Sequence, residues 1–102
     1  EIKTCIALDS RIGEKFLNSS VGWGGSCFKK DILALTYLAE MKGLDEVANY
    51  WKAVIDMNDY RKRKFFERIF ETLNFNIKHK KVCILGTAFK KDTNDPRESP
   101  AV

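Results

Sequence analysis

The sequence predicts a mainly α-helical unit that is followed by the first strand and loop of an α/β domain. Residues 45–75 keep a helical apolar rhythm without a Gly or Pro, and residues 26–42 carry a shorter helical pattern. Residues 81–86 form a short apolar run that ends in Gly, as buried parallel strands do. We therefore expect a helical domain over residues 1–75 and the start of an α/β domain over residues 76–102.

The N-terminal part predicts two helices separated by a loop. Residues 2–8 have apolar side chains at helical spacing, and Gly13 follows soon after. Residues 18–25 read Asn-Ser-Ser-Val-Gly-Trp-Gly-Gly, which is too rich in small residues and glycine for a regular element. The helix predicted over residues 26–42 is closed by Gly43 as its C-terminal cap.

The predicted helix over residues 45–75 is long for so short a chain. At 1.5 Å per residue it would measure about 45 Å. A compact body of 102 residues does not extend so far, so part of its apolar face needs a second domain or subunit to cover it. We interpret it as a linker and dimerisation helix.

The C-terminal part of the sequence predicts a loop at the ligand-binding edge of a parallel sheet. The loop over residues 87–98 follows the predicted strand at its carboxyl end, where doubly wound α/β folds bind ligands. Ser99 and Pro100 then suit a helix start, while Glu1-Ile2-Lys3 suits no leader peptide. We expect the sequence to be an internal piece of a longer protein.

Charge and cysteine usage narrow the class of function. The net charge of +4 is a weak basic bias that suits an anionic small ligand better than nucleic acid, and no apolar run approaches the ~18 residues of a membrane span. Cys5, Cys27 and Cys83 lie far apart, and His79 is the one histidine, so neither a metal site nor a disulfide framework is expected. A reduced, cytoplasmic setting follows, with Cys5 and Cys83 packed in the core.

Cys27 is the candidate nucleophile. It lies behind the glycine-rich loop and in the first turn of the predicted helix, where unpaired backbone N–H groups stabilise a thiolate. Asp31, four residues on, shares its helix face and can hold a water or a proton beside the sulfur, while Lys30 adds a cation. The local pattern leaves open that Cys27 is a small structural residue and that the glycines only form a turn.

Nearly the whole chain resembles the UDP-glucose dehydrogenase family, because many motifs recur in order at the family's spacing. They are Asp9-Ser10-Arg11-Ile12-Gly13, Lys15-Phe16-Leu17, Ser20-Val21-Gly22, Gly24-Gly25-Ser26-Cys27-Phe28, Lys30-Asp31, Ile55-Asp56-Met57-Asn58-Asp59-Tyr60, Ile84-Leu85-Gly86, Ala88-Phe89-Lys90-Lys91-Asp92-Thr93 and Arg97-Glu98-Ser99.

This resemblance implies a four-electron oxidation of UDP-glucose to UDP-glucuronate, in which two NAD molecules take up hydride. Cys27 matches the cysteine that forms the covalent thiohemiacetal and thioester, and Asp31 matches the aspartate that helps organise the water. The implied fold is a helical central domain that mediates homo-oligomers, followed by a truncated Rossmann-like domain for the UDP-sugar. The family's N-terminal NAD domain, with its Lys and Asn near the reacting carbon, is not in this sequence, so the chain alone should be inactive.

The resemblance also implies a set of binding residues. Cys27, Lys30 and Arg97 match contacts to NAD, and Arg11 matches an arginine that reaches the substrate of a neighbouring subunit. Trp23 stands where the family usually has Phe, and Asn18 where some members have Lys. The residues that match substrate contacts are Arg11, Phe16, Leu17, Asn18, Ser19, Ser20, Val21, Gly22, Trp23, Gly24, Phe28, Phe89 and Lys90.

Two other interpretations compete with this one. The chain could act as a helical oligomerisation module whose cysteine is structural. It could also belong to a related dehydrogenase that acts on UDP-mannose-type or GDP-mannose substrates, although the motifs around Cys27 and Asn58 are nearer the UDP-glucose enzymes.

Overall fold

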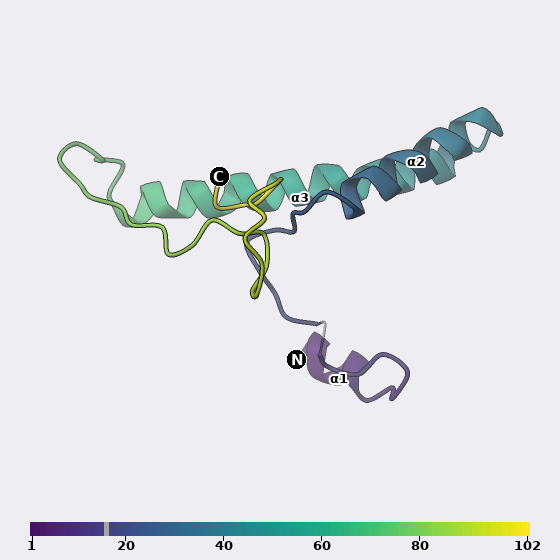
Figure 1. Ribbon diagram of the computed structural model, residues 1–102, viewed down its shortest axis with the longest axis horizontal. Coiled ribbons are helices and arrows are strands. Elements are labelled where there is room, and N and C mark those ends of the chain that lie inside the picture. Colours follow the sequence, from purple (N-terminus) through teal and green to yellow (C-terminus); the bar gives the residue numbers. More distant parts are fainter. Residues whose placement is uncertain (16) are drawn as a thin grey trace.

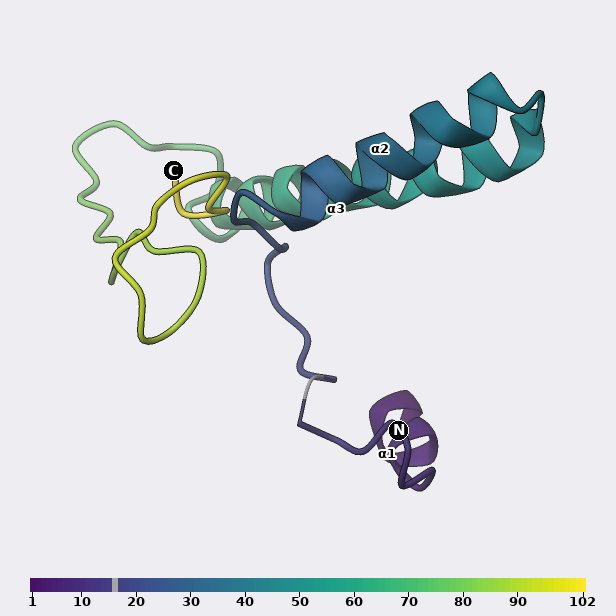
Figure 2. The same ribbon diagram turned by 45° about the vertical axis from the view of Figure 1, so that its right-hand side comes forward.

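The computed structural model describes residues 1–15 and 17–102, which form three helices: α1 (Ile2–Ala7), α2 (Phe28–Met41) and α3 (Asp45–Thr72). α2 and α3 lie side by side and antiparallel, whereas α1 lies apart from them (Figures 1 and 2). The molecule is elongated, with extents of 53 × 34 × 28 Å. The prediction of a mainly helical chain is confirmed.

A tight turn at Gly43 reverses the chain between α2 and α3. Gly43 has a φ of +66°, the left-handed conformation that glycine adopts without a steric penalty. Its N–H donates to the Glu40 carbonyl at 2.9 Å, and the Leu44 N–H donates to the Ala39 carbonyl at 3.0 Å. These bonds satisfy the last carbonyls of α2, so the predicted C-terminal cap is confirmed.

A narrow stripe of side chains holds the two helices together. Ile32, Thr36 and Ala39 are buried at i, i+4 and i+7 along α2, and Ala48 is buried on α3. Three of these four side chains are small, which lets the helix backbones approach closely. Ile32 is the largest of them and only 1% exposed, so most of the apolar burial in this stripe comes from one side chain.

The remaining apolar surface of the hairpin is largely open. On α2, Leu33, Leu38 and Met41 are 50%, 57% and 66% exposed, and on α3 Met57 and Phe66 are each 59% exposed. α3 has 28 residues and is therefore about 42 Å long. Within the described residues no other helix covers these faces. That a second domain or subunit covers them stays a prediction.

α3 ends three residues before the predicted position. Asn74 and Phe75 have φ values of +52° and +55°, and the Phe75 N–H donates to the Phe70 carbonyl at 2.8 Å. The helical apolar pattern continues to Phe75, but left-handed residues cannot extend an α-helix.

None of the helices in the described part is both long and apolar enough to cross a bilayer.

The strand expected over residues 81–86 is not formed, and the described residues contain no strand at all. A strand is stable only when its backbone pairs with a neighbour, and residues 81–86 have no such partner here. The expectation that Cys5 and Cys83 are core residues is also wrong for this chain, because both are exposed.

The segment from residue 87 onward folds back beside the middle of α3, next to the start of α2 (Figures 1 and 2).

We predict that Ile32→Ala destabilises the hairpin by about 2–5 kcal/mol, since it removes the one large buried side chain of the stripe. Leu33→Ala is the matched control, because Leu33 is 50% exposed and its truncation should cost far less. Urea unfolding followed by helical circular dichroism measures both variants. Equal loss of stability in the two would show that the stripe does not hold α2 to α3.

We also predict that the 102-residue chain associates in solution, because the exposed apolar side chains of α2 and α3 gain free energy when another copy covers them. Sedimentation velocity should show a mean mass that rises with protein concentration. A single species at monomer mass over a hundredfold range of concentration would contradict this expectation.

Candidate functional site

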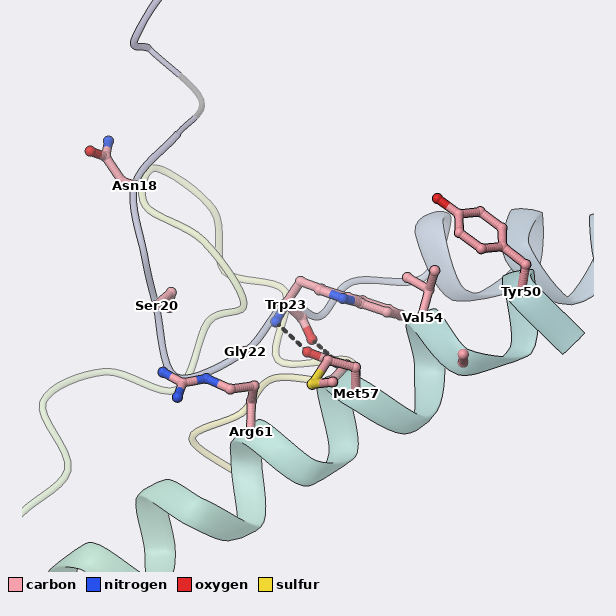
Figure 3. Close-up of a pocket in the computed structure, with 10 residues that line it drawn as sticks. Asn18, Ser20, Gly22, Trp23, Tyr50, Val54, Met57 and Arg61 are labelled. Atoms are coloured by element: carbon pink, nitrogen blue, oxygen red, sulfur yellow. Dashed lines mark hydrogen bonds between the residues drawn. The ribbon is translucent and has the colours of Figure 1, made fainter. Parts of the chain in front are cut away.

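The glycine-rich loop over residues 18–25 is anchored to α3 by one side chain. The Trp23 N–H donates to Asn58 Oδ1 at 2.9 Å, and Asn58 Nδ2 donates to the Trp23 carbonyl at 3.0 Å (Figure 3). Asn58 is only 6% exposed, so these bonds satisfy a buried amide on both of its polar ends. Trp23 also packs edge-to-face on Phe28, with 4.8 Å between ring centroids.

The last two glycines of the loop lie against the C-terminal segment. The Gly25 N–H donates to the Arg97 carbonyl at 2.8 Å. A Cβ at Gly24 would collide with the Glu98 carbonyl, and a Cβ at Gly25 would lie 2.8 Å from Phe89 Cε2. Glycine is therefore required at both positions for the two segments to meet, which is a more specific reason than the turn that the sequence suggested.

Cys27 lies at the start of α2, directly after this contact. It is the N-cap residue of α2, it is exposed, and its Sγ lies 3.8 Å from Ser26 Oγ. The Asp31 N–H donates to the Cys27 carbonyl at 3.0 Å, which closes the first helical turn. Asp31 is exposed in that turn, so a carboxylate and a thiol lie at the same end of the helix.

Arg97 is held beside Cys27 by an acidic partner. Its Nε and Nη2 donate to the two carboxylate oxygens of Asp95 at 2.8 and 2.7 Å. This hydrogen bonding lowers the pKa of Asp95 to about 2 and raises the pKa of Arg97, to which the nearby Cys27 also contributes. Because the carboxyl pKa is depressed, the pair is intact at neutral pH and is lost only as the pH falls through about 2.

A cavity of about 630 Å³ lies between the loop and α3 (Figure 3). In Figure 3 the Trp23 indole runs along α3 toward Val54, and the Arg61 side chain extends toward the loop at Gly22. The cavity includes four residues predicted to contact substrate, together with α3 residues that the sequence did not single out. Its lining residues are Asn18, Ser20, Gly22, Trp23, Tyr50, Ala53, Val54, Met57, Asn58 and Arg61.

A second cavity of about 560 Å³ lies between the start of α2 and the C-terminal segment. It brings together Lys30 and Arg97, the two basic residues predicted to contact the cofactor, although they are 67 positions apart in sequence. Lys29, which sequence reasoning missed, adds a third cation and forms an ion pair with Glu98 at 3.0 Å. Lys29 is paired with Glu98 and Arg97 with Asp95, so three basic side chains face two carboxylates, and the remaining positive charge favours an anionic group in this cavity.

The other predicted residues take varied positions. Phe89 is half-buried against the glycines, and the Lys90 ammonium lies 5.3 Å from the centre of its ring. Val21 is half-buried in the loop and Ser19 is exposed there, while Leu17 precedes it.

Arg11 is not brought to the site. It is exposed and paired with Asp9, in the segment that lies apart from the hairpin. Its contact with the substrate of a neighbouring subunit stays a prediction. The predicted substrate contact at Phe16 lies outside the described residues.

Comparison with known proteins identifies close relatives along the whole chain. It is 57% identical over all 102 residues to UDP-glucose 6-dehydrogenase 3 of Arabidopsis thaliana, and 57% identical to UDP-glucose 6-dehydrogenase of Mus musculus. A rice relative, UDP-glucose 6-dehydrogenase 3 of Oryza sativa subsp. japonica, is 56% identical. The chain spans 21% of the length of each of these relatives.

The family assignment rests on an independent match. Residues 1–60, which include the glycine-rich loop, Cys27, α2 and the first half of α3, match the profile of the UDP-glucose/GDP-mannose dehydrogenase family, central domain. The match ends just past Asn58, so it contains both partners of the contact between the loop and α3. The chain therefore belongs to the UDP-glucose/GDP-mannose dehydrogenase family.

Proposed function

We propose that this chain is part of an NAD-dependent dehydrogenase that oxidises UDP-glucose to UDP-glucuronate, with Cys27 as its covalent nucleophile. The observation that carries the proposal is the position of Cys27, exposed at the first end of α2 between the glycine-rich loop and Arg97. The names of the relatives that align with the whole chain support the choice of substrate.

In this proposal the cavity against α3 holds part of the UDP-sugar. Its mixed lining suits such a ligand, because Trp23, Val54 and Met57 offer an apolar wall while Arg61 offers a cation. The predicted contacts Ser19, Val21, Gly24 and Phe28 belong to the same loop or directly follow it. From the C-terminal segment, Phe89 lies against the loop glycines Gly24 and Gly25, and Lys90 lies over the Phe89 ring.

The cavity beside Arg97 holds an anionic part of NAD. Lys29, Lys30 and Arg97 fit a phosphate group, and Cys27 follows directly on the lining residue Ser26. When bound, NAD supplies the hydride acceptor for both oxidations. The remainder of its site, and the base for the first oxidation, belong to parts of the dehydrogenase beyond this chain.

The reaction uses Cys27 after the alcohol at C6 has become an aldehyde. The Cys27 sulfur forms a bond to the aldehyde carbon, and the former carbonyl oxygen takes a proton, which gives a thiohemiacetal. Loss of a hydride and a proton from this group leaves a thioester. Water, held by Asp31, attacks the thioester carbon, the carbon–sulfur bond breaks, and the carboxylate leaves while the cysteine recovers its proton. One water and two hydride acceptors are consumed for each alcohol.

The same proposal accounts for the open surfaces of the chain. Residues 1–75 form a central dimerisation domain whose exposed faces are covered in a homo-oligomer, and residues 76–102 begin a Rossmann-like UDP-sugar domain. There residues 81–86 acquire the strand partners that they lack here. The chain alone is inactive, and the complete dehydrogenase is a cytoplasmic protein with no nucleic acid or membrane partner.

A helical oligomerisation module is the second candidate. The small buried stripe and the many exposed apolar side chains of α2 and α3 favour it. It differs from the first proposal in one respect, because it gives Cys27 no chemical role. A third candidate is a related nucleotide-sugar dehydrogenase, since the name of the family includes GDP-mannose. Turnover of the complete protein with UDP-glucose and with GDP-mannose, measured side by side, distinguishes this candidate from the UDP-glucose dehydrogenase.

We predict that Cys27→Ala in the complete dehydrogenase lowers NADH production from UDP-glucose by several orders of magnitude, because neither thiohemiacetal nor thioester can form. UDP-glucose affinity, measured by calorimetry, should stay within about threefold, a change of ~0.7 kcal/mol. Cys5→Ala is the matched control, since Cys5 is exposed on α1.

The outcome that contradicts the proposal is equally specific. Turnover of Cys27→Ala within about tenfold of the parent would correspond to only ~1.4 kcal/mol of transition-state stabilisation. In that case Cys27 is not the nucleophile, and the oligomerisation module with a structural cysteine is the better account.

A further inference from the structure

Asn58 differs from the other buried polar side chains of the described residues. Thr36 and Ser99 are buried to a similar degree, but Thr36 Oγ1 donates to Ile32 on its own helix and Ser99 Oγ accepts from Ala101 in its own turn. Asn58 instead bonds to a residue 35 positions away. It therefore joins two parts of the fold, whereas the other two only satisfy local backbone.

The contact fixes the backbone of the loop in both directions. The single side chain of Asn58 occupies the N–H and the carbonyl of Trp23, so the peptide groups on both sides of that residue are held. Gly22 makes room for it, because it has a φ of +153° and a Cβ there would lie 3.0 Å from Asn58 Oδ1. A side chain at Gly22 would be strained at this φ and would crowd the Asn58 amide.

The held backbone leads directly to the reacting end of α2. The Trp23 indole lines the larger cavity, packs on Phe28, and is separated from Cys27 by only three residues. Between them, Gly25 is bonded to the Arg97 carbonyl. The loop is thus fastened to α3 at Trp23 and to the C-terminal segment at Gly25.

We propose that Asn58 is the positioning residue that holds the glycine-rich loop in its substrate-binding shape. Without it, the Trp23 backbone would exchange its bonds for water, and the loop would have to be ordered each time the nucleotide sugar binds. The cost would therefore fall on substrate binding more than on the chemical step at Cys27. This inference rests on the proposed function, since it assigns Asn58 a part in binding the UDP-sugar.

The test uses the complete dehydrogenase with two substitutions of similar shape. Asn58→Asp keeps an acceptor for the Trp23 N–H but loses the donor to the Trp23 carbonyl, and Asn58→Leu loses both. Asn49→Asp and Asn49→Leu are the matched controls, because Asn49 is exposed on the same helix. Steady-state KM and kcat, together with calorimetric affinity for UDP-glucose, are measured for all five proteins.

We expect KM and Kd to rise about tenfold or more in Asn58→Leu and by less in Asn58→Asp, while kcat falls less than threefold and the Asn49 variants match the parent. An unchanged KM in both Asn58 variants would overturn the inference, as would a loss of the folded enzyme in both, since Asn58 would then be structural. If only Asn58→Leu fails to fold, Asn58→Asp decides. Lack of turnover in the parent would instead refute the proposed function.

Discussion

The packing of α2 on α3 through Ile32 is the constraint on which the rest of the structure depends. One large buried side chain and three small polar or apolar neighbours align two helices over the length of α2, and the left-handed turn at Gly43 makes them antiparallel. This arrangement places the first end of α2 beside the middle of α3. Asn58 is thereby brought within reach of Trp23, and Cys27 lies next to the loop that these two residues anchor.

The candidate site is built from contacts between segments that are distant in sequence. The loop reaches α3 through Asn58 and the C-terminal segment through Gly25, whose N–H is bonded to the Arg97 carbonyl. Two glycines permit that approach because any side chain would collide with Glu98 or Phe89. Cys27 lies at the start of α2, directly after Ser26, which lines the basic cavity, and close behind Trp23, which lines the cavity against α3.

The local sequence pattern was sufficient to predict the helices and the loop. It was insufficient wherever the structure of a segment depends on another segment that packs or pairs with it. The apolar rhythm and Gly43 predicted α2 and α3 to within three residues, because a helix satisfies its own backbone. The apolar run over residues 81–86 needs a second strand, so its composition alone could not form one. The expectation that Cys5 and Cys83 are buried failed because apolar neighbours in the sequence do not by themselves supply a surface that covers the side chain. The role of Asn58 could not be read from its motif, because its partner lies 35 residues away.

The most direct test of this account is amide hydrogen exchange of the 102-residue chain, measured by NMR at Trp23 and Gly25. Both N–H groups lie in a loop without regular structure, yet one is bonded to Asn58 and the other to the Arg97 carbonyl. The account predicts that both exchange at least tenfold more slowly than the exposed loop amides at Ser19 and Ser20, and that Ile32→Ala removes the difference. Exchange at the rate of an unstructured peptide in the parent, with α2 and α3 still protected, would contradict it.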